Sequence, residues 1–149
     1  MSWMSNINKI FDLFSQEPED SSKEDKQQEQ ILVDFKNHPI YSVLMFKKMI
    51  LNHLYNRKMV ISLMKQSDPK LDEENILKMG DSICFNRALD YLASLDFNSE
   101  LVDKSIKEQA DEDLLFTVNK AIEYFENLEH YEQCAFLKQV QEKVKENLN

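Results

Sequence analysis

Histidine and cysteine, the residues that most often bind metals or act as nucleophiles, are few in this chain of 149 residues. His130 and Cys134 lie four positions apart, a spacing that places both on one face of a helix and would let them share a zinc ion. A closed zinc site needs about four ligands, and the sequence has no Cys-x-x-Cys pair to supply the others. A di-iron bundle needs Glu-x-x-His, and no histidine has a Glu three positions before it. The spacing therefore predicts neither a metal site nor a metal cofactor.

Cys84 and Cys134 are also the candidate nucleophiles. Both fall inside apolar helical stripes, where an unpaired Cys behaves as a small hydrophobic side chain rather than as an activated thiolate. The carboxylates at positions 111–113 could attract a cation, but consecutive side chains point to different sides of a helix, so they are better explained as favourable charge at a helix N-terminus. We predict that the protein is not an enzyme and that it needs no cofactor.

Turn-forming residues are scarce, with one Gly and three Pro in the whole chain. This leaves almost no material for hairpin turns or glycine-rich phosphate loops, which excludes nucleotide-binding α/β folds and β-sandwiches. Apolar residues make up 42% of the chain and charged residues 30%, a balance typical of one globular domain. We predict an all-α fold, a compact bundle of about five or six helices over residues 31–149 that ends in an antiparallel helical hairpin.

Residues 1–15 are predicted to form an amphipathic helix, because their apolar residues recur at spacings of three and four. A polar flexible linker is predicted over residues 16–30, where every residue but Pro18 is polar or charged. An apolar helix on such a linker folds back onto the domain, docks on a partner or pairs with a second copy as a homodimer. The predicted partner-binding residues of this segment are Trp3, Ile7, Ile10, Phe11, Leu13 and Phe14.

The segment over residues 40–65 is apolar on nearly all sides, which is typical of a buried helix. Pro39 is expected in its first turn and Pro69 just beyond its end. Residues 36–67 carry six cations and no acid. The block is either a central core helix whose lysines meet acidic neighbours or a basic amphipathic binding helix. We favour the core helix.

A helical hairpin is predicted over residues 118–144, where two apolar stripes are separated by a short turn. Within this segment the residues that match a known hairpin motif are Ala121, Asn127-Leu128-Glu129, Tyr131-Glu132, Cys134-Ala135 and Leu137-Lys138. In this pattern the segment resembles the UVR motif of the bacterial excision-repair proteins UvrB and UvrC, a hairpin that binds other proteins. The resemblance implies that Tyr131 and Glu132 contact a partner. His130 and Gln139 depart from the motif, and a generic tight hairpin is the alternative.

Residues 10–14, Ile-Phe-Asp-Leu-Phe, are similar to the acidic-Leu-Phe core of peptides that dock on DNA sliding clamps. This resemblance implies a partner in DNA metabolism or transcription. The leading functional hypothesis is therefore a non-enzymatic adaptor or regulator that binds another protein through the N-terminal apolar helix and the C-terminal hairpin.

Acidic side chains outnumber basic ones by 27 to 18, which gives a formal net charge of −9. Such a protein repels phosphate, so no direct nucleic-acid binding is expected. Residues 68–149 carry nine cations and nineteen acids. These residues could imitate the phosphate array of DNA, as small phage-encoded inhibitors do. The alternative function is therefore an acidic inhibitor of a nucleic-acid-processing enzyme. With two cysteines and no signal peptide or membrane span, we expect a cytoplasmic protein without a membrane partner.

Overall fold

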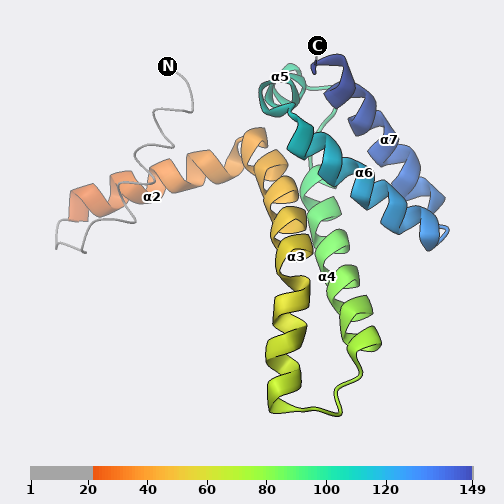
Figure 1. The fold of residues 1–149 in the computed structure, drawn as a ribbon. Coiled ribbons are helices and arrows are strands. Elements are labelled where there is room, and N and C mark those ends of the chain that lie inside the picture. Colours follow the sequence, from red (N-terminus) through yellow and green to blue (C-terminus); the bar gives the residue numbers. More distant parts are fainter. Residues whose placement is uncertain (1–21, 149) are drawn as a thin grey trace.

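The computed structural model describes residues 22–148, which form six α-helices joined by short turns (Figure 1). In chain order they are α2 (Ser22–Asn37), α3 (Pro39–Ser67), α4 (Glu73–Ala93), α5 (Glu100–Gln109), α6 (Glu112–Asn127) and α7 (Tyr131–Glu146). The predicted all-α bundle of about five or six helices is thus confirmed. Among these residues no helix is long and apolar enough to cross a membrane.

Helix α2 corrects the prediction of a flexible linker over residues 16–30. Residues 22–30 are helical, whereas residues 16–21 lie outside the described part of the chain. The segment is rich in Lys, Glu and Gln, which favour helices without any need for burial. Glu24 and Asp25 also place negative charge in the first turn, where the helix dipole is stabilised by it. A polar sequence therefore excluded a packed core but not a helix.

The break between α2 and α3 follows from a capping residue, which the sequence did not predict, and from a proline, which it did. His38 is the N-cap of α3, and its Nδ1 accepts a hydrogen bond of 3.1 Å from the backbone N–H of Ile40. Pro39 occupies the first turn of α3, where its missing N–H would have no partner in any case. At the other end, the backbone N–H of Asp68 donates to Met64 O and the helix stops before Pro69.

The hydrophobic core lies where the first half of α3 and the second half of α4 meet α5, α6 and α7 (Figure 1). Its largest fully buried side chains include Phe46, Ile50, Leu92, Ile106, Leu114, Phe125 and Leu137. Burial of each such side chain is worth roughly 1.5–3 kcal/mol. Asp111 secures the start of α6, because its carboxylate accepts from Leu114 N at 2.6 Å and from Lys47 Nζ at 3.0 Å.

Helices α6 and α7 form the predicted antiparallel hairpin. Their turn is a Schellman motif, in which His130 N donates to Phe125 O and Glu129 N donates to Glu126 O, both at 2.9 Å. Glu129 has a φ of 58°, a left-handed conformation that normally favours Gly. The apolar stripes of the two helices face each other and the core, which buries Ala121 and the other small or branched residues of the stripe.

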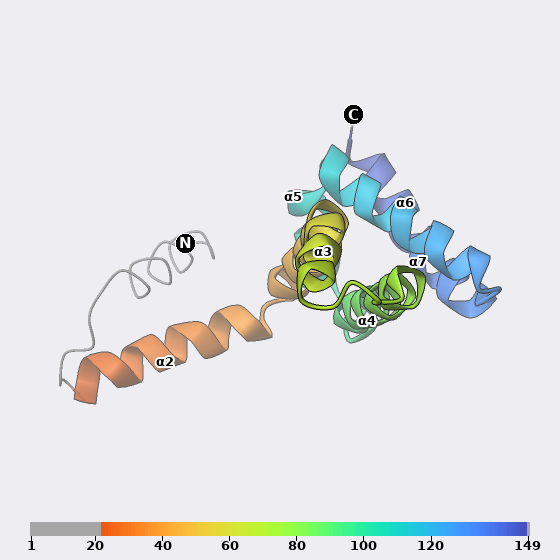
Figure 2. The same cartoon turned by 60° about the horizontal axis from the view of Figure 1, so that its bottom comes forward.

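The second half of α3 and the first half of α4 extend away from the other helices as a two-helix projection (Figures 1 and 2). We call this projection, residues 51–83, the arm. Helix α2 leaves the bundle on one side of the α3–α4 pair, and the α6–α7 hairpin lies on the other side (Figure 2). The arm and α2 are therefore the two parts of the described chain that stand out from the bundle.

Candidate functional site

The sequence-predicted partner-binding residues fall in two places. Those of the N-terminal segment lie outside the described residues; they are Trp3, Ile7, Ile10, Phe11, Leu13 and Phe14. Tyr131 and Glu132 begin α7 at the tip of the C-terminal hairpin, and both are exposed, with 69% of the surface of Tyr131 accessible. Beside them Leu128 is the only other large apolar side chain exposed in the turn between the two helices. The hairpin tip is thus accessible but small.

The arm exposes far more apolar surface than the hairpin tip, and the sequence did not predict this. The expectation that α3 is enclosed over its whole length is wrong for its second half, where Ile61 is the only buried residue after Ile50. On α4, no residue before Cys84 is buried. The exposed apolar side chains of the arm, each 37–73% accessible, are Tyr55, Met59, Val60, Leu63, Met64, Met79 and Ile83.

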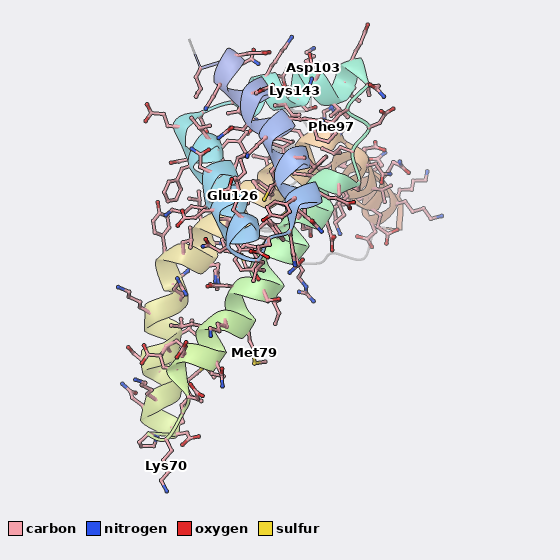
Figure 3. The ribbon with its side chains drawn as sticks, turned by 90° about the vertical axis from the view of Figure 1, so that its right-hand side faces the viewer. Lys70, Met79, Phe97, Asp103, Glu126 and Lys143 are labelled. Atoms are coloured by element: carbon pink, nitrogen blue, oxygen red, sulfur yellow. The ribbon has the colours of Figure 1, made fainter. Side chains whose placement is uncertain are left out.

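The mismatch in helix length explains the exposure. Helix α3 has 29 residues and is about 44 Å long, whereas α6 and α7 have 16 residues each and are about 24 Å long. The shorter helices can cover only half of α3. Met79 shows the result, because its side chain points away from the ribbon of α4 into solvent (Figure 3). An apolar helix much longer than its neighbours was the signal in the sequence that could have predicted the arm.

A polar cluster joins the two helices of the arm. Asp81 of α4 bridges two residues of α3, because its carboxylate oxygens lie 2.6 Å from His53 Nε2 and 3.0 Å from Arg57 Nη2. Gly80 lets the helices approach here, since a Cβ at that position would lie 3.3 Å from His53 Cε1. Further out, Lys65 pairs with Glu73. These contacts hold α3 and α4 together beyond the hydrophobic core.

The same cluster has no activated nucleophile. Cys84 lies one turn along α4 from Asp81, but burial and then the charge of Asp81 raise the pKa of its thiol to about 11. Its Sγ points to the backbone oxygen of Met49 at 3.6 Å. Cys134 is buried too, and burial raises its pKa. No group of three or more His, Cys, Asp or Glu side chains in the described part of the chain could hold a metal ion.

A groove of about 560 Å³ opens between α3 and α4 near the base of the arm, with both polar and apolar walls. Its lining residues are Met45, Met49, Arg87, Asp90, Tyr91 and Ser94. Tyr91 also contacts Tyr41 edge-on, with the two ring centroids 6.0 Å apart. Burial and then the neighbouring Tyr91 raise the pKa of Tyr41. The groove thus presents methionine, tyrosine and arginine, side chains that are common at protein interfaces.

A second hollow, about 600 Å³ in volume, lies beside α5 and α7 and is lined mainly by charged groups. Lys107 and Lys143 both donate to Asp103, each at 3.0 Å, and these hydrogen bonds hold the pKa of the Asp103 carboxyl below its usual range (Figure 3). Lys104 reaches Glu108 at 4.0 Å. The lysines of this hollow are therefore already neutralised by the protein's own carboxylates.

Comparison of the chain with protein-family models, with curated proteins and with solved structures found no match. The resemblance of the C-terminal hairpin to the UVR motif stays a prediction.

Charge distinguishes the arm from the rest of the chain. Residues 51–83 contain five cations and five acids, so the arm has no net charge. Residues 99–148 contain six cations and twelve acids, a net charge of −6. The molecule therefore combines a neutral, partly apolar projection with an acidic helical body.

Proposed function

We propose that the protein is a non-enzymatic adaptor or regulator that binds another protein, and that the arm is its principal docking surface. The single observation that supports this proposal is the set of large apolar side chains that the arm leaves exposed. A contiguous exposed apolar surface is unfavourable in water and marks sites of protein association. The body exposes fewer such side chains, because α6 and α7 turn their apolar stripes to the core; those that it exposes are Leu101, Phe116, Leu128 and Tyr131.

The chemistry of the arm indicates what kind of partner it accepts. Met59, Met64 and Met79 provide flexible, polarisable contacts that adapt to an apolar helix or groove, and Tyr55 adds an aromatic anchor. The arm's zero net charge means that long-range charge attraction contributes little to its association. The N-terminal apolar segment and the hairpin tip with Tyr131 are the further contact surfaces of this proposal.

The test is affinity capture from a lysate of the native source, followed by mass spectrometry. We expect the full chain to retain a partner and the variant Leu63→Glu in the arm to lose it, because a charge placed in an apolar interface is costly to desolvate. Leu101→Glu is the matched control, since Leu101 lies on α5 and is 48% exposed, against 56% for Leu63. A partner that both variants retain would argue against docking through the arm.

The acidic body supports one alternative, an inhibitor that imitates DNA and occupies a nucleic-acid-processing enzyme. Its basis is the net charge of −6 over residues 99–148, including the carboxylates of Asp111, Glu112 and Asp113 at the start of α6. Binding of this kind weakens steeply as salt screens the charges, whereas docking through the neutral arm does not. A captured partner that is released by moderate salt but retained by Leu63→Glu would favour the inhibitor.

A further inference from the structure

The α3–α4 pair is covered by other helices on one flank only. On the covered flank, the ring of Phe85 stacks on Tyr124 of α6, with ring centroids 4.6 Å apart. Arg87 follows Phe85 by two residues, which places it about 200° further round α4. The groove lined by Arg87 and Met49 therefore opens on the flank that faces away from α6.

This open flank continues from the groove towards the tip of the arm. On α4, Ile83 and Ile76 precede Arg87 by four and eleven residues, and both spacings keep a residue on one face of a helix. On α3, Val60 and Leu63 follow Met49 by eleven and fourteen residues and share its face in the same way. The result is a strip, which we call the open strip, whose apolar residues Val60, Leu63 and Ile83 are 46–56% exposed and in which Asn52 and Asn56 lie between Met49 and Val60. From Met49 to Leu63 it is about 21 Å long.

Helix α2 joins the bundle beside the open strip. Phe35, near the end of α2, packs edge-on against Tyr41 at 5.4 Å, and Tyr41 contacts Tyr91, which lines the groove. Figure 2 shows α2 on the opposite side of the α3–α4 pair from α6 and α7. The chain that precedes Ser22 is thus attached on the uncovered side of the molecule.

We infer that residues 3–14 of the same chain are the occupant of the open strip. Helix α2 has 16 residues and spans about 24 Å, and the seven residues 15–21 can reach back about 23–25 Å when extended. At full extension Phe14 can therefore return to the base of α2, where Phe35 and Tyr41 lie beside the Tyr91 end of the strip. As a helix, residues 3–14 are about 18 Å long, so from Tyr91 they extend to Ile83, eight residues or about 12 Å along α4, and cover the groove end of the strip.

Charge and tethering favour this occupant. Residues 1–15 contain one cation, Lys9, and one acid, Asp12, so both the segment and the arm are neutral and do not repel each other. The covalent connection gives the segment an effective concentration that a free partner rarely reaches. This inference rests on the proposed function, because the segment then covers the Ile83 end of the docking surface until a partner displaces it.

Trp3 makes a direct test, since it is the only Trp in the chain. We expect the fluorescence of the purified full chain to be blue-shifted and protected from acrylamide quenching, with no dependence on protein concentration. Ile83→Glu introduces a charge at an already exposed position that the segment reaches, and it should lower the docking equilibrium at least about tenfold. Trp3 should then shift to the red. Leu101→Glu on α5 is the control and should leave Trp3 unchanged.

Three results would overturn the inference. They are a solvent-exposed Trp3 in the unmodified chain, a protected Trp3 that Ile83→Glu leaves unchanged, and a protection that disappears on dilution, which would identify a second copy as the occupant. Circular dichroism checks that the variants remain helical. Because this test uses the isolated protein, a solvent-exposed Trp3 together with loss of partner capture by Leu63→Glu would leave the proposed function standing. A docked Trp3 together with a partner that Leu63→Glu still retains would support the inference and contradict the proposed function.

Discussion

The protein contains two antiparallel helical hairpins that use similar residues in opposite ways. The α6–α7 hairpin buries one apolar stripe from each helix and leaves an acidic outer surface. The arm of α3 and α4 has apolar side chains on several faces, yet Ile61 is its only buried residue. In the arm, polar contacts between His53, Arg57 and Asp81 and between Lys65 and Glu73 connect the helices.

This difference shows that apolar character alone does not decide burial. A side chain is buried when another element reaches it, and the elements that could cover the arm end halfway along α3. The C-terminal hairpin is part of the hydrophobic core, whereas the arm is an extension of it with a separate local stability. We expect experiments to separate the two hairpins clearly.

The largest predicted effect is a pair of identical substitutions, one in each hairpin. Leu137→Ala on α7 removes a side chain that is 0% exposed, and we expect it to lower the free energy of unfolding by about 2–5 kcal/mol. Leu63→Ala in the arm removes a side chain that is 56% exposed and should change it by no more than about 0.5 kcal/mol. Urea denaturation measures both. Equal losses would mean that the arm is as tightly packed as the C-terminal hairpin.

A smaller effect should localise to the arm. Asp81→Ala leaves both His53 and Arg57 without their carboxylate acceptor, which should cost about 1–3 kcal/mol in local stability. Hydrogen exchange should show faster opening of residues 51–83 and little change in α6 and α7. Glu74→Ala is the control, because its pair with Lys78 is more than 70% exposed on both sides and is worth about 0.5 kcal/mol or less. Uniform faster exchange throughout the chain would contradict a separate arm.

A change at the turn of the C-terminal hairpin should stabilise the protein. Glu129 has a positive φ, and Glu129→Gly should raise the free energy of unfolding by about 1 kcal/mol because Gly adopts this conformation without strain. Glu142→Gly, inside α7 and one turn from its end, should instead lower it by up to about 0.5–1 kcal/mol. Thermal or urea denaturation distinguishes the two. Destabilisation by Glu129→Gly would show that its side chain contributes more than its backbone strain costs.

The weakest expected signal is a dependence of stability on alkaline pH. It comes from Cys84, which lies where the arm meets the core. The unfolded Cys84 thiol ionises near 9.0, whereas burial keeps the native thiol protonated up to a pKa of about 11. The native state therefore binds more protons than the unfolded state between these values, so stability falls as pH rises from 9 to 11 and is unaffected below 9. The free energy of unfolding of Cys84→Ala should fall less steeply between pH 9 and 11 than that of the natural chain. Parallel curves would contradict the assigned cause.

Most of the local structure could be predicted from short stretches of sequence. Pro39 and Asp68 mark the ends of α3, Asp72 and Asp111 cap α4 and α6, and the turn before Tyr131 separates the two helices of the C-terminal hairpin. Each of these features depends on backbone hydrogen bonds within a few residues. The first half of α2 is the exception: it has no apolar residues to bury, and its helix depends on the propensity of Lys, Glu and Gln.

The candidate site was not predictable in this way. By itself the sequence determined the all-helical class, the boundaries of α3 and of the C-terminal hairpin and the burial of both cysteines, because these follow from local propensity, capping and apolar periodicity. Only the tertiary structure decided which half of α3 is covered, that Tyr55 and Met59 face solvent, and that one flank of the α3–α4 pair is open. The reason is physical: burial depends on elements brought together from distant parts of the chain, and their reach is set by helix length and packing rather than by the residue that is covered.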